Sequence, residues 1–475
     1  MAPLRLTKLY AGGKWAESGS PDTIPVINPA TEEVLAEVAA GCPADAELAV
    51  ASARQAFESW AATSPAERGK YITLIGEALC DRAEELAATV SAELGVPHHL
   101  ALGTQITSQI AKFISYAELA GTFPWEERVG GSTIVRAPVG VVVAITPWNF
   151  PLNQAVDKIA PALLAGCPVI LKPSELTAIS THAFAQAADE AGLPAGVFNL
   201  VNGAGSTVGE ALVRHPGVDM ISFTGSTSSG KRIAALAAER VARVALELGG
   251  KSATILLDDA DLDKAIPEAV KGCYFNAGQV CVALSRLLVP RSRYDEVVER
   301  VKGVVEGWKV GDPSTQVDIG PLVSSSQRDR VRSYIERGVQ EGARLVTGGP
   351  DVPSGLDRGY YVQPTVFADV KSSMTIAQEE IFGPVLSILA YEDDDDAVHI
   401  ANDTPYGLSG GVWSRDTERA EGVARRIRTG MVKINGTNDP AAPFGGFKQS
   451  GVGREHGQYG IEEFVELQAI MSPAT

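Results

Sequence analysis

The chain has 475 residues, of which 45% are hydrophobic and 21% charged, the composition of an ordinary globular protein. This length exceeds what a single hydrophobic core usually supports, so we expect two or three domains. The 41 basic and 58 acidic residues give a formal net charge of −17. Such an acidic balance disfavours nonspecific binding to nucleic acid or to an anionic membrane.

Cysteine usage and the lack of a targeting segment favour the cytoplasm. The five cysteines are few, odd in number and without the spacing of metal ligands, so we predict a reducing compartment and no metal site. No apolar stretch follows the first six residues. The longest apolar run, residues 139–145, falls well short of the ~20 residues that span a membrane. We expect a cytoplasmic protein that is neither exported nor inserted in a membrane.

The first part of the chain is predicted to be helical, and the next part alternates strands with helices. Residues 45–95 are rich in alanine, and Ser64 followed by Pro65 is typical of a helix start. Short apolar runs then alternate with helical stretches, at residues 139–145, 169–171, 197–201, 220–223 and 241–246. This alternation predicts βαβ units and a parallel sheet in a Rossmann-like nucleotide-binding domain.

A second α/β section is predicted between residues 252 and 448. Its strands are expected near residues 253–257, 285–289 and 385–389. Residues 133–137 and 464–470 look extended and lie outside both sections. These two segments could pair in an excursion that joins subunits.

Two glycine-rich turns have the form of phosphate-binding loops. GSTSSGK at residues 225–231 follows a predicted strand, but Arg232 stands where a P-loop needs Ser or Thr to hold magnesium. An NTPase is therefore disfavoured, although the turn still places the free N–H groups of a helix N-terminus where a pyrophosphate could bind. GAGSTVG at residues 203–209 is one residue longer than the dinucleotide fingerprint, and a plain tight turn is the alternative.

Lys172 and Glu175 favour a nucleotide site. They follow the predicted strand at residues 169–171, so they lie at the carboxyl end of a strand, where open α/β sheets bind ligands. An ammonium and a carboxylate there could hydrogen-bond the two hydroxyls of a ribose. For this segment alone, a surface turn is the alternative.

Glu247, Cys281 and Asn149 form a candidate catalytic set. Cys281 follows a small, polar stretch typical of a loop or helix start, and a helix N-terminus or a positive charge would favour its reactive thiolate. Glu247 is a base able to activate water, and the Asn149 amide could hold an oxyanion. Cys273, on a predicted helix at residues 264–275, is more typical of core packing. The set predicts an enzyme that forms a thioester from an aldehyde and then hydrolyses it.

The chain resembles the NAD(P)-dependent aldehyde dehydrogenases over essentially its whole length. Six motifs occur in the family's order: TPWNFP at 146–151, KPSE at 172–175, FTGS at 223–226, ELGGK at 247–251, GQVC at 278–281 and EEIFGP at 379–384. NPAT at residues 28–31 and PFGGFKQSG at residues 443–451 extend the match toward both ends. The altered glycine spacing also fits, because this family looks like a variant of the nucleotide fold without the usual fingerprint.

The resemblance implies a non-acylating aldehyde dehydrogenase, which oxidises an aldehyde to a carboxylic acid. Cys281 would attack the aldehyde carbonyl, and the Asn149 amide and the Cys281 N–H would hold the oxyanion. Hydride would leave for NAD(P)+, and water activated by Glu247 would hydrolyse the thioester.

The resemblance also implies which residues bind the cofactor. Lys172 and Glu175 would hold the adenosine ribose, Ser226 the pyrophosphate and Glu380 the nicotinamide ribose. A carboxylate at position 175 favours NAD over NADP, since it would repel a 2′-phosphate, although NADP stays possible. The full predicted set is Ile145, Thr146, Trp148, Lys172, Ser174, Glu175, Gly205, Gly209, Phe223, Gly225, Ser226, Leu248, Glu380 and Phe382.

The implied architecture is α/β, with a Rossmann-like cofactor domain, an α/β catalytic domain and a small β oligomerisation element. The expected boundaries are residues 1–119 and 139–249 for the cofactor domain, 250–448 for the catalytic domain, and 120–138 with 449–475 for the oligomerisation element. A homodimer or homotetramer is implied, with no nucleic-acid or membrane partner.

Several alternatives stay open. A coenzyme-A-acylating enzyme would not need a water-activating base, so Glu247 argues against it. A semialdehyde-specific enzyme would run the same reaction on a charged substrate, and no cationic cluster settles that choice. A catalytically inactive binding protein is opposed by the joint presence of Cys281, Glu247 and Asn149. The loop at residues 435–439 is expected to shape the substrate tunnel, and its polar character permits a hydroxylated or aromatic aldehyde.

Overall fold

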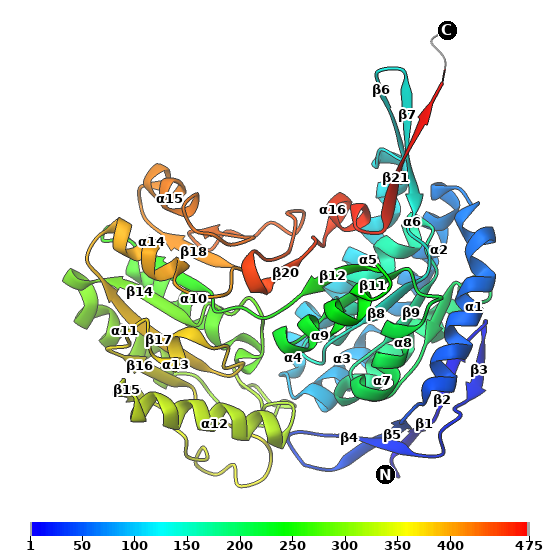
Figure 1. Ribbon diagram of the computed structural model, residues 1–475. Helices are drawn as coiled ribbons and strands as arrows, with labels where there is room; N and C mark the ends of the chain where they lie inside the picture. The colour runs from blue at the N-terminus through cyan, green and yellow to red at the C-terminus, as the bar shows by residue number, and fades with distance from the viewer. Residues whose placement is uncertain (1, 473–475) are drawn as a thin grey trace.

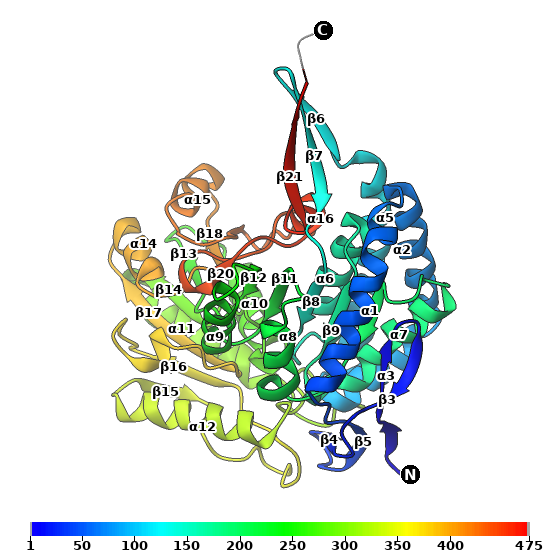
Figure 2. The ribbon, with the colours of Figure 1, turned by 45° about the vertical axis from the view of Figure 1, so that its right-hand side comes forward.

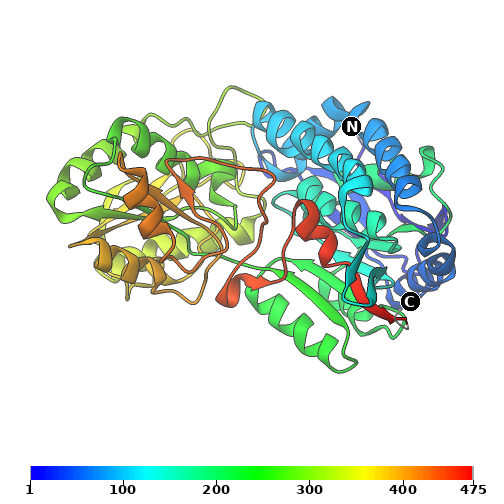
Figure 3. The same ribbon diagram turned by 90° about the horizontal axis from the view of Figure 1, so that it is seen from above.

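The structure, a computed structural model, describes residues 2–472. Residue 1 and residues 473–475 lie outside the described part. They are the ends of the predicted segments 1–119 and 449–475. The chain forms two lobes, each built around its own sheet, and a slender three-stranded arm that projects from the first lobe (Figure 1). The two lobes lie side by side when seen from above (Figure 3). The predicted α/β class is confirmed.

The first lobe contains an eight-stranded sheet in the order β20-β12-β11-β8-β9-β10-β2-β3. Its five central strands, β12 to β10, are parallel, and the outer strands pair antiparallel. These five strands are the five predicted for the Rossmann-like domain. The bounds are β2 Lys8–Ala11, β3 Lys14–Glu17, β8 Val142–Ile145, β9 Val169–Lys172, β10 Phe198–Leu200, β11 Met220–Thr224, β12 Arg243–Glu247 and β20 Gly451–Val452.

Helices cover this sheet and bury the apolar side chains of its strands. The alanine-rich stretch at residues 45–95 forms three of them, and Ser64 Oγ accepts a hydrogen bond from Glu67 N at 3.2 Å, as expected of a helix cap. The bounds are α1 Pro43–Ala61, α2 Pro65–Cys80, α3 Ala83–Leu94, α4 His98–Leu100, α5 Ser108–Thr122, α6 Pro151–Ala165, α7 Ala178–Glu190, α8 Glu210–Arg214, α9 Thr227–Ala238 and α16 Gly457–Glu462.

The second lobe contains a seven-stranded sheet in the order β15-β16-β17-β14-β13-β18-β19, parallel except for β15. The three strands predicted for this section are β13, β14 and β17. The strand bounds are β13 Ala253–Leu256, β14 Arg286–Pro290, β15 Arg344–Thr347, β16 Thr365–Ala368, β17 Val385–Tyr391, β18 Gly410–Trp413 and β19 Lys433–Ile434. The helix bounds are α10 Leu262–Tyr274, α11 Tyr294–Glu306, α12 Ser325–Gln340, α13 Thr375–Gln378, α14 Asp394–Asn402 and α15 Thr417–Ala424.

The arm is the three-stranded sheet β21-β7-β6, with β6 Glu126–Val129, β7 Ser132–Pro138 and β21 Val465–Met471. Strands β7 and β21 pair antiparallel, and both views of the arm show them side by side (Figures 1 and 2). The predicted pairing of two distant extended segments is therefore confirmed. A further small sheet of β1 Leu4–Leu6, β4 Thr23–Ile27 and β5 Val34–Ala39 was not predicted.

Two predicted strands begin two or three residues later than expected, β8 at Val142 instead of residue 139 and β12 at Arg243 instead of residue 241. Val241 is 92% exposed, with a positive φ of 58°, and it lies in the turn before β12 rather than in the strand. Its apolar β-branched side chain is typical of strands, but its position before the buried segment decides its conformation. Among residues 2–472, none of the helices combines the length and the apolar character needed to cross a membrane.

Candidate active site

The parallel strands of the first sheet end along one edge, and most of the predicted cofactor residues lie at those ends. This is the edge at which open α/β sheets bind ligands. The residues are Gly205 and Gly209 after β10, Lys172, Ser174 and Glu175 at the end of β9, Ile145, Thr146 and Trp148 at the end of β8, Phe223, Gly225 and Ser226 at the end of β11, and Leu248 after β12.

Lys172 and Glu175 lie together at the end of β9. Lys172 Nζ is 3.6 Å from Glu175 Oε2 and donates to the Pro173 carbonyl at 2.9 Å. Burial lowers the pKa of Lys172, and the Glu175 carboxylate counteracts this effect. A Cβ added to Gly209 would lie 4.0 Å from Lys172 Cδ. The second glycine-rich turn therefore lies beside this pair.

The first glycine-rich turn begins a helix, as predicted. Ser226 caps α9, and its Oγ accepts a hydrogen bond from Ser229 N at 3.2 Å. Phe223 packs beneath Gly225, where an added Cβ would lie 2.5 Å from the ring. The turn can therefore accept only glycine at position 225 without displacing Phe223.

A cavity of about 190 Å³ joins this edge to the second lobe. It contains six of the predicted cofactor residues and both Asn149 and Cys281. The cofactor residues in its wall are Trp148, Gly225, Ser226, Leu248, Glu380 and Phe382. Trp148 and Phe382 meet edge to face, with ring centroids 5.3 Å apart, across the two lobes. Glu247 and the remaining predicted residues lie outside the cavity wall.

Cys281 lies in an irregular turn of the second lobe. Asn276, Ala277 and Gly278 have positive φ angles of 52°, 56° and 72°. A Cβ on Gly278 would lie 2.2 Å from the Gly383 carbonyl oxygen, so the close approach of these two loops requires glycine. The predicted loop is confirmed, but no helix begins at Cys281, because the next regular element of the described chain after this turn is β14.

Asn149 contacts this turn directly. Its Nδ2 donates to the Gln279 carbonyl at 2.9 Å, while Asn276 Nδ2 and Gln105 Nε2 donate to the Asn149 carbonyl at 3.0 and 3.2 Å. A side-chain amide has two N–H donors, so one stays available to a ligand in the cavity. The side-chain amide is therefore held by the second lobe, and the backbone carbonyl of Asn149 is held by residues of both lobes.

The electrostatic surroundings of Cys281 differ from the expected ones. Burial, followed by the nearby carboxylates of Glu380 and Glu247, raises the pKa of the Cys281 thiol. The Val282 N–H donates to the sulfur and acts in the opposite direction. We expected a helix N-terminus or a positive charge to favour the thiolate. In this structure neither is beside the sulfur among the described residues, so the surroundings of Cys281 favour the neutral thiol over the thiolate.

Glu247 is buried at the end of β12, next to a second carboxylate. Burial raises the pKa of Glu247, and Glu455 raises it further, whereas Lys158 lowers it. Lys158 Nζ lies 2.5 Å from Glu455 Oε1 and donates to Thr224 Oγ1 at 2.7 Å. Both Glu247 carboxylate oxygens lack a hydrogen-bond partner among the described residues. A buried carboxyl group with free lone pairs is suited to bind and deprotonate a water molecule.

Glu380 reaches across from the second lobe to the glycine pair after Glu247. Gly250 N–H donates to Glu380 Oε1 at 3.1 Å, and burial raises the pKa of Glu380 to about 7. A Cβ on Gly249 would lie 2.3 Å from the carboxylate. The carboxylate therefore sits directly against the backbone of the ELGGK segment.

Several residues of the site were not predicted from the sequence. Gln327 and Arg330 of α12 line the cavity, and Arg330 Nη2 donates to the Glu380 carbonyl at 2.8 Å. Lys158 and Glu455, the buried pair beside Glu247, were also missed. None of these four belongs to a quoted binding motif, although Glu455 lies just beyond PFGGFKQSG.

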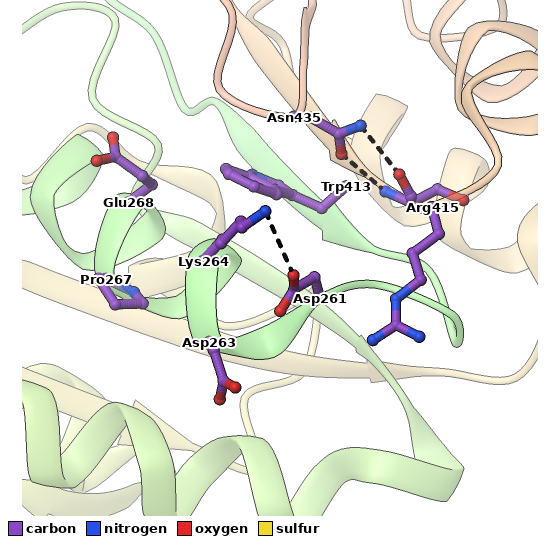
Figure 4. Close-up of a pocket in the computed structure, with 9 residues that line it drawn as sticks. Asp261, Asp263, Lys264, Pro267, Glu268, Trp413, Arg415 and Asn435 are labelled. Carbon is purple, nitrogen blue, oxygen red and sulfur yellow. Dashed lines mark hydrogen bonds and ion pairs between the residues drawn. The ribbon is translucent and has the colours of Figure 1, made fainter.

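Two of the other hollows in the second lobe include residues of the predicted tunnel loop at 435–439. A cavity of about 350 Å³ is lined by Phe275, Val280 and Val282, the last two flanking Cys281, and by Gly436 and Asn438 of the predicted tunnel loop. A more open hollow of about 710 Å³ lies between the start of α10 and the ends of β18 and β19 (Figure 4). It contains an Asp261–Lys264 ion pair at 3.7 Å and no residue of the predicted catalytic set.

The fold and the cavity define a class of protein. A parallel sheet offers its carboxyl edge to an extended ligand, and a second lobe brings a cysteine and a carboxamide to one end of that edge. This arrangement is that of a nucleotide-dependent enzyme with a thiol nucleophile.

Comparison with known proteins is consistent with this class. The sequence matches the model of the aldehyde dehydrogenase family over residues 15–470. It is 47% identical to a 3-succinoylsemialdehyde-pyridine dehydrogenase of a Pseudomonas species, over 98% of both chains.

Among solved structures, an aldehyde dehydrogenase C mutant of Pseudomonas syringae in complex with NAD+ and octanal is 48% identical. It superposes with a TM-score of 0.97 over 99% of this chain and 98% of that one. A Mycobacterium tuberculosis aldehyde dehydrogenase bound to NAD+ is 45% identical, with a TM-score of 0.96 over 99% of each chain.

The chain belongs to the aldehyde dehydrogenase family. It is an oxidoreductase that converts aldehydes to carboxylic acids with NAD(P)+ as the oxidant.

Proposed function

We propose that the protein oxidises an aldehyde with NAD+ through a covalent thioester on Cys281. The observation that carries this proposal is that two groups in the cavity wall lie near a third, the buried carboxyl group of Glu247. Cys281 and Asn149 line the cavity wall, and the Glu247 carboxyl group lies close enough to influence the pKa of the thiol. A nucleophile, an oxyanion donor and a base are the three functions that the reaction needs.

The first step is the attack of the Cys281 sulfur on the aldehyde carbon, which forms a C–S bond and an oxyanion. The free N–H of the Asn149 amide donates to that oxyanion. The sulfur attacks as the thiolate, so the thiol proton leaves for solvent before the C–S bond forms, and Glu247 acts on the water of the second step. Bound NAD+ supplies the hydride acceptor that turns the adduct into a thioester.

The second step is hydrolysis. Glu247 takes a proton from a water molecule, the resulting hydroxide attacks the thioester carbon, and the C–S bond breaks to release the carboxylic acid and the Cys281 thiolate. Glu455, which is paired with Lys158, lies near Glu247 and is a second buried carboxylate that can share the proton. The buried carboxylate favours water over coenzyme A as the acceptor, so we favour the hydrolytic enzyme over the acylating one.

The predicted cofactor residues fit a dinucleotide. Lys172 and Glu175 would hold the adenosine ribose, and the N-terminus of α9 at Ser226 would hold the pyrophosphate. Glu380 would hold the nicotinamide ribose. The Glu175 carboxylate is the group that disfavours the 2′-phosphate of NADP, which supports NAD as the preferred cofactor.

We propose a homo-oligomer and a cytoplasmic location. The support for assembly is the arm, because strand β6 is exposed throughout and Leu467, Ile470 and Met471 of β21 carry exposed apolar side chains. The support for the cytoplasm is that all five cysteines are free thiols.

The first experiment is NADH formation with a panel of aldehydes for wild type and the variants Cys281→Ala and Cys80→Ala. We expect turnover to vanish in Cys281→Ala while NAD+ still quenches the tryptophan fluorescence of the protein, to which Trp148 in the cavity wall contributes. Cys80 is exposed on α2 and serves as the matched control, so Cys80→Ala is expected to keep full activity. Retained turnover in Cys281→Ala would refute the nucleophile.

A further inference from the structure

Helix α6 opens toward solvent at one place only. Within Pro151–Ala165, every residue except Asn153 is buried, and Asn153 lies in the first turn of the helix, four residues after Asn149. Phe150, between them, is half-buried and stacks against Phe275 with ring centroids 6.3 Å apart. The opening therefore adjoins both the oxyanion donor and the turn that carries Cys281.

Lys112 of α5 presents its ammonium group to this opening. Its Nζ lies 2.6 Å from Asp157 Oδ1 and donates to Asn153 Oδ1 at 3.2 Å. An ammonium has three N–H donors, so these two acceptors orient the head group and leave one donor free. The Lys112 side chain is 19% exposed and that of Asp157 is 1% exposed. The Lys112 side chain is therefore partly accessible, whereas the Asp157 carboxylate that pairs with it is buried.

The surroundings of Lys112 are polar. Gln109, one turn earlier on α5, has a buried Oε1 without a partner among the described residues. His456 Nε2 lies 3.5 Å from Asp157 Oδ2, and the His456 ring packs on Phe444 at 5.2 Å. An alkyl chain in this opening would remove water from these groups without replacing their hydrogen bonds, which is unfavourable.

We propose that Lys112 is a specificity-determining residue that selects aldehydes with a carboxylate at the far end. The inference rests on the proposed function of Cys281 and names the substrate class for that site. The free N–H of an oriented ammonium makes a charge-assisted hydrogen bond, which is about twice as strong as a neutral one. Asn153 follows Asn149 by four residues and lies at the start of α6. This short segment between the oxyanion donor and the acceptor of Lys112 suits a short semialdehyde of about four to six carbons.

A second cation competes for this role. Lys433 lines the 350 Å³ cavity beside Val280 and Val282, and burial lowers its pKa while Glu268 counteracts this. Among the described residues no hydrogen bond or ion pair orients the Lys433 ammonium, whereas Lys112 has both. The geometry favours Lys112, and the two lysines can be separated by experiment.

The test compares kcat/KM for succinic semialdehyde with that for butanal, which has the same number of carbons and no carboxylate. Wild type should prefer the semialdehyde by about tenfold or more, and Lys112→Met should remove that preference through a higher KM, with butanal changed less than about twofold. Lys70→Met, an exposed lysine on α2, is the control and should keep the wild-type ratio.

Lys112→Met leaves Asp157 buried without its nearest cation, so the double variant Lys112→Met/Asp157→Asn guards against misfolding and should show the same loss. Equal use of both aldehydes by wild type would overturn the inference. So would a preference that survives in the double variant, or one that collapses in Lys433→Met instead. If neither aldehyde nor any other is oxidised, the proposed function itself fails.

Discussion

Two buried carboxyl groups share one ammonium group at the centre of the site. Glu247 and Glu455 both lie near Lys158, whose Nζ is committed to Glu455 and Thr224. Neighbouring like charges resist joint ionisation, so the raised pKa of Glu247 reports both its burial and the charge of Glu455. The base form of Glu247 therefore becomes populated only as the pH rises through that raised pKa.

The variant Glu455→Gln tests this coupling. Removing the Glu455 charge removes a cause that raises the pKa of Glu247 and leaves Lys158, which lowers it. The acidic limb of the profile of kcat/KM against pH should therefore move to lower pH, by about one unit or more. The acidic limb could instead stay in place in a variant that still folds and binds NAD+. That result would show that the limb does not report the titration of Glu247.

The variant Glu247→Gln separates the two chemical steps. The amide cannot accept a proton from water, so thioester hydrolysis should slow by about 10²–10⁴-fold, the usual contribution of a general base. Stopped-flow measurement should then show a burst of NADH of about one equivalent per site, followed by a slow steady state. Loss of the burst together with the steady state would instead assign Glu247 to thiol deprotonation alone.

The catalytic residues could be predicted from the sequence, but their surroundings could not. Local motifs contain Cys281, Glu247 and Asn149, so the sequence alone predicts the chemical role of each. Lys158 and Glu455 are 297 positions apart, and only the fold makes them a pair. The raised pKa of Cys281 was also hidden, because it depends on burial and on carboxylates from two lobes.

At the scale of elements, the turn before Cys281 is the feature that positions the sulfur. Three successive residues with positive φ lead into it, and the last of them, Gly278, touches the backbone of Gly383. The strained conformation is held by Asn149, which hydrogen-bonds both ends of the turn through Asn276 and Gln279. The turn and the start of α6 therefore form one rigid unit across the lobe interface.

The variant Gly278→Ala should displace this unit. A Cβ there meets the Gly383 oxygen at 2.2 Å, and the left-handed conformation adds strain of about 1–3 kcal/mol. We expect a large loss of kcat and a lower melting temperature. Gly303→Ala is the matched control, because Gly303 lies within α11 with nothing within 4 Å of the added Cβ, so this variant should be slightly stabilised.

The central strands of both sheets were predictable, whereas the short outer strands were not. A buried parallel strand such as β8 or β9 is a continuous apolar run, and its signal is strong. Strand β19 has two residues and β1 has three, and their conformation depends on pairing with strands far along the chain. Sequence periodicity carries no signal over such lengths.

At the scale of the whole molecule, the site exists only where the two lobes meet. The first lobe contributes the sheet edge and Asn149, and the second contributes Cys281 and Glu380. Strand β21 of the arm belongs to residues 449–472, and the same segment carries Glu455, which lies near the Glu247 carboxylate. Packing that fixes the arm therefore acts close to the site.

The arm gives the last prediction, because an isolated three-stranded sheet with exposed apolar residues is stabilised by a partner surface. Leu467 of β21 is 66% exposed, so in a homodimer or homotetramer bound through the arm we expect it to be covered. Leu467→Lys should then shift the mass measured by light scattering toward the monomer. Leu48→Lys, a 44% exposed position on α1, should leave the mass unchanged. A wild-type protein that is already monomeric at micromolar concentration would refute the role of the arm in assembly.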